Sequence, residues 1–267
     1  MMRAVAAVVV LGAAALAVAI AVARRGEGDG ARCGAGFVVR GPRCVVDVGA
    51  SCSSPLVSTP QGCDAPELRV AVEAAAVTVG PSDWEAEGRI QSRSIHVQAF
   101  RIDAFEVTRG QWGDVRDGDA ARAASAMTRD EAAAFCASRG GRLPTEDEWI
   151  VAAASAANPP RRYPWGDTGA VCRRAAWGLA SGPCARSGNG PDTVGAHRDG
   201  DSPLGLHDLA GNVAEWVAAE PAHPDIGVVK GGSWRSDLAA DLRIWARLEL
   251  SPQAHDSRAG LRCAYRP

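Results

Sequence analysis

The longest apolar stretch of the chain lies at its N-terminus, where residues 4–23 contain no charged side chain. Arg3 precedes this stretch, and Arg24 and Arg25 follow it. A helix of these twenty residues, at about 1.5 Å per residue, would extend roughly 30 Å, the thickness of the hydrocarbon core of a bilayer. Cleavable signal peptides usually have a shorter apolar region of about 7–15 residues, although residues 21–23 would suit cleavage. The pattern therefore favours an uncleaved transmembrane helix within a segment 1–25 over a cleaved signal.

Two later stretches alternate between apolar and polar residues as strands do. Residues 68–79 alternate imperfectly, and residues 94–102 alternate with a period of two. Ile95, Val97 and Ile102 cannot share one face without a bulge, because successive side chains of a strand point to opposite faces. We expect strands in both stretches, with an irregularity in the second.

Two capping boxes predict helices. One begins at Thr128 and the other at Thr145, and each has a glutamate three positions later that can accept from the free N–H of the capping residue. The first helix is expected to end at the glycines 140–141, and the second at residue 157, before Asn-Pro-Pro at 158–160. The rest of the chain is rich in Gly, Pro, Asp and Trp and lacks periodicity, which predicts ordered loops and short strands.

The chain has eight cysteines, and all of them follow the apolar segment. They are Cys33, Cys44, Cys52, Cys63, Cys136, Cys172, Cys184 and Cys263. An even number of cysteines behind an export signal indicates disulfides in an oxidising compartment. Ten residues separate Cys33 from Cys44 and Cys52 from Cys63, and eleven separate Cys172 from Cys184. A small loop can close each of these spans. The pairing among the first four stays open. Zinc is not expected, because no C-x2-C pair occurs.

Composition and the cysteines divide the chain into three parts. Residues 26–66 hold four cysteines and many glycines and are expected to be a disulfide-stapled segment next to the membrane, whereas residues 67–267 are expected to form the folded domain. The domain is expected on the extracytoplasmic side, or in the periplasm or medium if the leader is cleaved. The net charge of −2 provides no basic surface, so nucleic acid is not an expected partner.

Oxygen-bearing side chains recur at fixed spacing in LHDLAGNVAEW, residues 206–216. Asp208, Asn212 and Glu215 alternate there with apolar residues, and buried carboxylates need a cation or hydrogen-bond donors. Such oxygens at a glycine turn suit calcium. The same spacing also fits one face of an amphipathic helix, and both interpretations remain open from the spacing alone.

A second candidate site is KGGSW at 230–234, which places a glycine pair before a tryptophan and Arg235. The pair is typical of a tight turn, but Trp beside Arg is also a common surface for gripping a ligand. No neighbouring base supports Ser233 as a nucleophile. Arg243 and Arg247 are expected to pin loops from inside. The five histidines are scattered and are expected on the surface or in loops: His96, His197, His207, His223 and His255.

Taken together, six motifs in order resemble the formylglycine-generating enzyme domain, also called the sulfatase-modifying-factor domain, over roughly residues 67–267. The motifs are FEVTRGQW (105–112), GGRLPTEDEW (140–149), YPWGD (163–167), LHDLAGNVAEW (206–216), VVKGGSW (228–234) and AGLRCAY (259–265). The resemblance implies an irregular α+β variant of the C-type lectin fold with little regular secondary structure. It also implies a disulfide between Cys136 and Cys263. The implied calcium ligands are the side chains of Asp208 and Glu215 and the carbonyls of Gly211 and Val213.

The resemblance is incomplete at the catalytic positions. In enzymes of this family, the sequence resembling KGGSW is followed by two cysteines that bind Cu(I) as thiolates and activate oxygen. The corresponding positions here fall at Ser236 and Asp241, or at their neighbours if the loop is two residues shorter, and in either register no cysteine lies between Cys184 and Cys263. A hydroxyl or a carboxylate is a poor ligand for Cu(I). Copper is therefore not expected. The groove of the family would be bordered here by Ser233, Trp234 and Arg235.

Two functional hypotheses follow. In the first, the domain is exported, is tethered to the membrane by residues 4–23, and acts as a binding or structural module in the cell envelope. Its partner would be a peptide, a glycan or an envelope protein. In the second, it is an enzyme of the family that oxidises a cysteine or another envelope substrate through a site not evident from the sequence. The lack of the two copper cysteines favours the first hypothesis.

Overall fold

The computed structural model describes residue 33 and residues 37–40, 43–46, 52–79, 92–115, 118–158, 160–186 and 190–267. The predicted transmembrane segment 1–25 lies outside the described residues. Within the described ranges, no helix combines the length and the hydrophobicity that crossing a bilayer requires.

Short strands and few helices make up the fold. The strands are β1 (Phe37–Arg40), β2 (Arg43–Val46), β3 (Val57–Thr59), β4 (Gly62–Asp64), β5 (Arg69–Val72), β6 (Ala75–Val79), β7 (Arg93–Val97), β8 (Phe100–Asp103), β9 (Ala214–Trp216), β10 (Gly227–Lys230), β11 (Arg247–Leu250), β12 (Ala259–Gly260) and β13 (Ala264–Tyr265). The helices are α2 (Arg109–Trp112), α3 (Arg129–Ser138) and α4 (Glu146–Ala153), with 3-10 turns η2 (Arg198–Gly200) and η3 (Ala239–Leu242).

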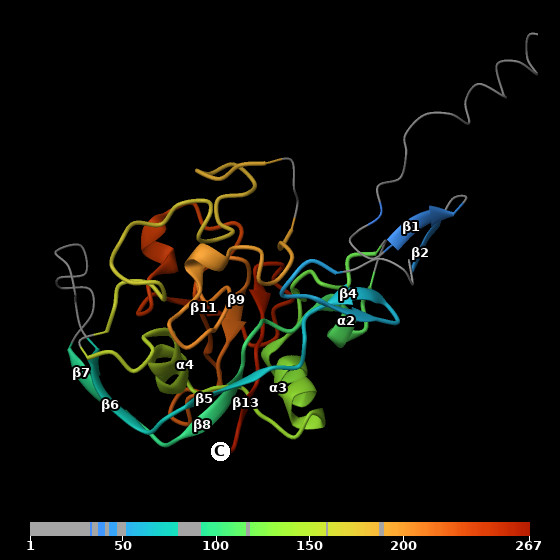
Figure 1. Cartoon of the computed structure of the whole chain (residues 1–267). Coiled ribbons are helices and arrows are strands. Elements are labelled where there is room, and N and C mark those ends of the chain that lie inside the picture. The colour runs from blue at the N-terminus through green and yellow to red at the C-terminus, as the bar shows by residue number, and fades with distance from the viewer. Residues whose placement is uncertain are drawn as a thin grey trace, which may run out of the picture.

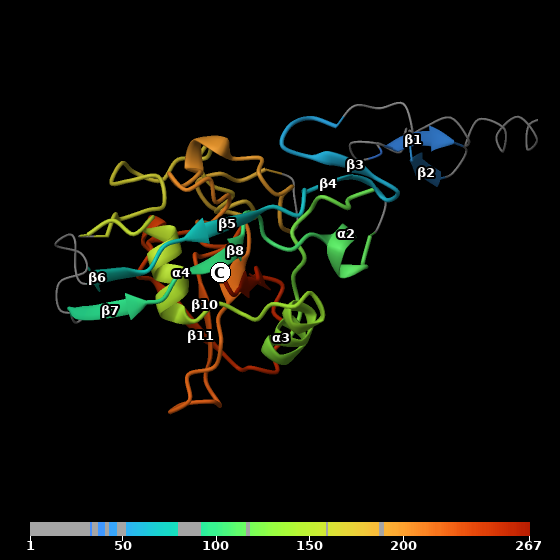
Figure 2. The same ribbon diagram turned by 60° about the horizontal axis from the view of Figure 1, so that its bottom comes forward.

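Strands from distant parts of the chain meet in two central sheets. One sheet has the strand order β11-β10-β9-β12 and mixes antiparallel pairs with the parallel pair β9–β12, and the other has the order β13-β8-β5. Helices α3 and α4 lie on either side of these strands (Figure 1). The hairpins β1–β2 and β6–β7 stand at opposite ends of the molecule (Figure 2). The irregular α+β arrangement with little regular secondary structure agrees with the expectation from the sequence.

Both predicted strands are divided in the structure. Residues 68–79 form β5 and β6, which belong to different sheets, and residues 94–102 contain most of β7 and β8. The second break falls at residues 98–99, and it lets Ile95, Val97 and Ile102 all become buried. The conflict of faces within that stretch is therefore resolved by ending one strand and starting another.

Both capping boxes form as predicted. The side chain of Thr128 accepts from the N–H of Glu131 at the start of α3, and that of Thr145 accepts from the N–H of Glu148 at the start of α4. Helix α4 ends at Ala153, four residues earlier than expected, because Ser155 and Ala156 adopt left-handed conformations with φ of 52° and 53°.

All eight cysteines are paired, in the disulfides Cys33–Cys44, Cys52–Cys63, Cys136–Cys263 and Cys172–Cys184. The pairing that the sequence left open among the first four is thus between near neighbours. The implied Cys136–Cys263 bond is confirmed and joins α3 to the C-terminal segment across a sequence separation of 127 residues. In the loop-entropy description, closing a loop of that length stabilises the fold by about 5 kcal/mol.

Two apolar clusters form most of the core. In the larger one, apolar side chains of the four strands β5, β6, β7 and β8 pack against the buried face of α4 and against loop residues such as Leu206 and Ile244. The other packs Ala132 and Cys136 of α3 against Trp216 of β9. The C-terminal strand contributes to both clusters, so the last residues of the chain complete the core.

Candidate functional site

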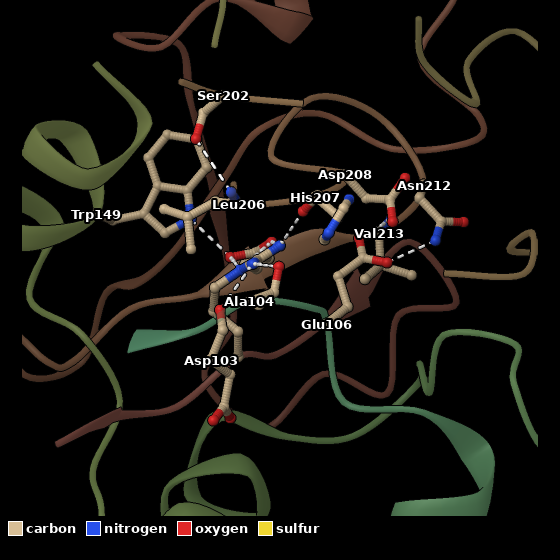
Figure 3. A network of polar contacts seen from close by, with 12 residues as sticks. Asp103, Ala104, Glu106, Trp149, Ser202, Leu206, His207, Asp208, Asn212 and Val213 are labelled. Carbon is tan, nitrogen blue, oxygen red and sulfur yellow. Dashed lines mark hydrogen bonds and ion pairs between the residues drawn. The ribbon is translucent and has the colours of Figure 1, made fainter. Parts of the chain in front are cut away.

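A buried arginine lies at the centre of the molecule. The side chain of Arg262 is 0% exposed, and its guanidinium donates to the Glu215 carboxylate through Nε (2.9 Å to each oxygen) and Nη2 (2.7 Å to Oε1). The remaining N–H groups donate to the carbonyls of Asp103 and Ala104, both at 3.0 Å, and of His207 at 2.7 Å (Figure 3). The guanidinium therefore has partners in every direction, which is what a buried charge requires.

The carboxylate of Glu215 is equally enclosed. Besides the bonds from Arg262, its Oε2 accepts from Nε1 of Trp149 in α4 at 2.7 Å. This places one carboxylate of β9 between the C-terminal segment and a helix that begins about seventy residues earlier in the chain. The contact explains why Trp149 is fully buried although it carries an N–H group.

Two further carboxylates share this interior. Glu106 accepts from the N–H of Val213 at 3.0 Å and from Nδ2 of Asn212 at 2.5 Å, and Asp208 accepts from the N–H of Gly195 at 2.5 Å. Burial, with the negative charges of Asp208 and Glu215, raises the pKa of Glu106 well above its usual value. Burial also raises the pKa of Asp208. Three acids thus share one guanidinium, and both the burial and the mutual repulsion of the carboxylates disfavour the ionised form of Glu106.

The segment LHDLAGNVAEW is a turn followed by β9 and not an amphipathic helix. Asp208 and Asn212 adopt left-handed backbone conformations, with φ of 55° and 50°, which turn the chain tightly before the strand. Calcium at Asp208, Gly211, Val213 and Glu215 stays a prediction. In the arrangement seen, the oxygens of Glu215 fit a guanidinium, and calcium binding would require them to leave Arg262. Within the described ranges, no group of three His, Cys, Asp or Glu side chains is arranged to hold a metal ion.

A cavity of about 620 Å³ opens beside the segment KGGSWRSDLAAD, residues 230–241. Its floor crosses three strands, because Ala214 of β9, Val229 of β10 and Leu248 of β11 lie on the same face of the sheet. Its walls come from the loop after β10 and from residues 256 and 258. The cavity therefore has an apolar base and is closed by loops, the usual form of a ligand site.

The positions that correspond to the copper cysteines both line this cavity. Ser236 and Asp241 lie on its wall together with Ser233 and Arg235, so four residues predicted for the groove lie together. Burial, with the charge of the neighbouring Asp237, raises the pKa of Asp241. The side chains at the two copper positions are a hydroxyl and a carboxylate with a reduced acidity.

Trp234 is placed differently from the prediction. It is 6% exposed and does not line the cavity; its Nε1 donates to the Ser257 carbonyl at 3.1 Å, and its own carbonyl accepts from the N–H of Leu179 at 2.8 Å. Trp234 therefore holds the wall from behind and does not form the rim. Arg235, which lies over the Trp234 ring at 5.5 Å, is the exposed member of the pair.

The glycine pair is both a turn and a close packing contact. Gly231 and Gly232 have φ of 90° and 70°, a region that favours glycine, and a Cβ on Gly231 would lie 2.8 Å from the Leu209 carbonyl oxygen. The Gly231 carbonyl accepts from the N–H of Gly211, and the N–H of Trp234 donates to the Asn212 carbonyl. The two predicted sites, at 206–216 and at 230–241, are thus one continuous structure.

Lys230, directly before the glycine pair, points to the opposite face of the sheet. Its side chain is fully buried, and Nζ lies 3.2 Å from Oε1 of Glu146 and 3.3 Å from the Trp245 carbonyl. Burial lowers its pKa to about 8. Arg247, also near Glu146 at 3.8 Å, is exposed and lines the cavity, whereas Arg243 is buried. The expected internal role therefore fits Arg243 only.

Sequence reasoning missed Arg262 and Glu106, and it did not foresee that His207, which lies in a loop as expected, is buried. His207 is buried, stacks on the ring of Phe105 at 4.2 Å, and its Nδ1 lies 2.7 Å from Asp201. Arg262 could have been found as the one charged residue inside AGLRCAY, next to a core cysteine, because a charge in such a place needs a buried partner.

Comparison with known proteins gives a consistent family. The family described as "Sulfatase-modifying factor enzyme 1-like domain" matches residues 57–267, a range that begins ten residues before the predicted domain boundary. The relative "Inactive C-alpha-formylglycine-generating enzyme 2" of Mus musculus is 37% identical over 144 residues, which cover 51% of this chain and 46% of the relative. "Hercynine oxygenase" of Mycolicibacterium thermoresistibile is 34% identical over 184 residues, 59% of this chain and 39% of the relative.

A more distant relative is the "Formylglycine-generating enzyme" of Thermomonospora curvata, 29% identical over 163 residues, which cover 52% of this chain and 54% of the relative. The chain spans about half or less of the first curated relatives it matches. Among solved structures, Treponema denticola variable protein 1 matches with a TM-score of 0.61 and 22% identity, covering 74% of this chain and 95% of that one. PvdO from Pseudomonas aeruginosa matches with a TM-score of 0.59 and 17% identity, covering 82% and 100%. These structures establish the similarity of the fold.

Replacing the central arginine tests the buried network. We expect Arg262→Met to lower the free energy of unfolding by about 3–5 kcal/mol, because Glu215 and three carbonyls lose their donors inside the protein. Arg266→Met, at the exposed arginine four residues later, is the matched control and should change stability by less than about 0.5 kcal/mol. Denaturant unfolding measures both, and equal effects of the two variants would contradict this account.

The buried lysine predicts a pH dependence. The pKa of Lys230 is about 8 in the folded protein and near 10.5 when unfolded, so between these values the unfolded chain binds more protons and stability rises with pH. The free energy of unfolding of the parent, measured relative to that of Lys230→Met, should rise by about 1–2 kcal/mol between pH 8 and pH 9.5 and should not change with pH below pH 7. Urea unfolding at a series of pH values measures the difference, and a difference that does not vary with pH would refute the shifted pKa.

Calcium binding at the turn can be tested separately. If Asp208 is a ligand, calcium raises the thermal midpoint of the parent, a chelator lowers it, and Asp208→Ala abolishes the response. Asp225→Ala, at an exposed aspartate of the β9–β10 connection, should keep the response and serves as the control. A midpoint of the parent that calcium does not move would leave Arg262 as the cation that serves Glu215.

Proposed function

Because the chain belongs to the family of sulfatase-modifying-factor domains, over residues 57–267, we propose that it is an exported binding module that has kept the family's cavity without its copper chemistry. The cavity beside residues 230–241 would receive a peptide or an envelope protein. A glycan is the other ligand that the sequence suggested.

One observation carries this proposal. Ser236 and Asp241 line the cavity at the positions where resemblance places two thiolates, and all eight cysteines of the chain are already bound in disulfides. Cu(I) prefers soft sulfur ligands, which neither a hydroxyl nor a carboxylate replaces. The cavity can hold a ligand, but it offers no thiolate pair for oxygen activation.

The names of the relatives support both hypotheses to different degrees. The relatives from mouse and cattle have names that begin with "Inactive", at 37% and 36% identity. Those called hercynine oxygenase and formylglycine-generating enzyme favour the alternative, in which this domain oxidises an envelope substrate. The residues at the copper positions are the reason why we propose binding and keep oxidation as the alternative.

Export is part of the same proposal. Four disulfides, two of them in the short hairpins β1–β2 and β3–β4 and their approaches, are typical of a chain that folds in an oxidising compartment. Residues 4–23 would then tether the domain to the membrane and keep it on the extracytoplasmic side.

A copper assay separates binding from catalysis. The purified full chain is incubated with Cu(I), oxygen and a cysteine-containing sulfatase peptide. We expect no stoichiometric copper and no aldehyde, because no thiolate is available in the cavity. Stoichiometric copper with oxidation of the peptide cysteine would establish the alternative.

A variant designed to bind copper makes this assay informative when the parent binds no Cu(I). Ser236→Cys combined with Asp241→Cys should bind about one Cu(I) per chain, since both positions line one cavity. Ser236→Cys alone is the matched control and should bind much more weakly. If the double variant, with its four native disulfides verified, binds no more copper than the single one, the placement of these two positions is wrong.

A further inference from the structure

Strand β11 is the exposed edge of the four-stranded sheet. The order β11-β10-β9-β12 puts β11 and β12 at the two edges, but β12 is buried, whereas Arg247, Leu248 and Glu249 of β11 are exposed. Throughout the described ranges, β11 pairs with β10 alone. In an antiparallel pair every second residue turns its N–H and C=O away from its neighbour, so β11 presents unused backbone groups along its outer side.

This edge continues the floor of the cavity. The register pairs Val229 with Leu248, and both line the cavity together with Ala214. An added strand beyond β11 would extend the same pleated surface, so every second of its side chains would lie on the face of the floor, and one of them beside Leu248 at the edge of the cavity. Arg247 and Glu249 belong to the opposite face by alternation, and they lie 3.6 Å apart as an ion pair.

Two exposed leucines line the same cavity. Leu238 is 65% exposed and Leu248 is 39% exposed. Leu238 belongs to the wall loop and Leu248 to the floor, so both offer apolar surface to a ligand of the cavity. Burying them would return about 25 cal/mol for each Å² of apolar surface removed from water.

The charges around the opening have both signs. Arg235, Arg258, Asp237, Asp241 and Asp256 line the cavity, and Arg247, which also lines it, directs its charge to Glu146 and Glu249. Arg258 and Asp256 already bind each other, with Nη2 to Oδ2 at 2.7 Å. Such a rim does not attract a polymer of one charge, and it accepts a peptide that carries few charges or both signs.

We propose that β11 accepts an extended peptide segment as an additional strand, which places an aliphatic or aromatic side chain beside Leu248 at the edge of the cavity. The backbone of the segment supplies the hydrogen bonds and the cavity selects the side chain, as in other cases of strand addition. This inference rests on the proposed binding function and specifies its ligand as an unfolded or extended stretch of a protein. A glycan has no N–H and C=O ladder that could pair with the edge in this way.

The probe is a displayed library of random linear dodecapeptides, selected on the full chain. An enriched peptide is synthesised, and its affinity is measured for the parent, for Leu248→Ser and for the control Leu68→Ser, an exposed leucine outside the cavity. We expect about tenfold or greater loss with Leu248→Ser and no loss with the control.

A backbone scan distinguishes strand addition from other binding. Single N-methyl groups along the peptide should weaken binding about tenfold at alternate positions and little at those between, since each removes a hydrogen bond only where the N–H points to β11. Amides of β11 should exchange more slowly in the complex. Binding that depends on Leu248 without the alternation and without slower exchange would overturn strand addition and leave the binding module intact. If no peptide is enriched, or if a glycan array gives Leu248-dependent binding instead, the peptide ligand itself is refuted.

Discussion

The pair of Arg262 and Glu215 is the constraint on which the rest of the structure depends. A charged guanidinium without solvent contact is tolerated only when its charge and all its N–H groups are matched, and here a carboxylate and three carbonyls match them. Those partners come from the end of β8, from the turn before β9 and from β9 itself. With the segment of Arg262 itself, four segments are thereby fixed relative to one another, and the Cys136–Cys263 bond holds the residue next to Arg262.

The same centre reaches the cavity through the backbone. Glu215 lies in β9 beside Ala214, a residue of the cavity floor, and the turn before β9 bonds to both Gly231 and Trp234. The wall that carries Ser236 and Asp241 follows β10 directly, and it is linked to the buried network by the hydrogen bonds of Gly231 and Trp234 to the turn before β9. Because these bonds involve backbone atoms, the position of the wall does not depend on which side chains it carries into the cavity.

Local signals in the sequence predicted local structure well, and they failed where distant contacts decide. The capping boxes at Thr128 and Thr145 formed because each depends on residues three positions apart. The strand predicted at 68–79 is divided because its two halves pair with different strands, β8 and β7. The alternation of apolar and polar residues does not show which strand a segment pairs with. Trp234 was expected at the rim, but its N–H bonds to Ser257, a contact that no spacing in KGGSW reveals. The disulfide between Cys136 of α3 and Cys263 was predicted from the family resemblance and not from the spacing of the cysteines.

The account is tested most directly by a double-mutant cycle on the central pair. The free energy of unfolding is measured for the parent, Arg262→Met, Glu215→Gln and the double variant. If the pair organises the fold, the double variant is more stable than the sum of the single losses predicts, with a coupling energy of about 2 kcal/mol or more, because the second change removes a charge that the first left unpaired. A coupling energy near zero would show that the two residues act independently, and it would contradict the central role given to them here.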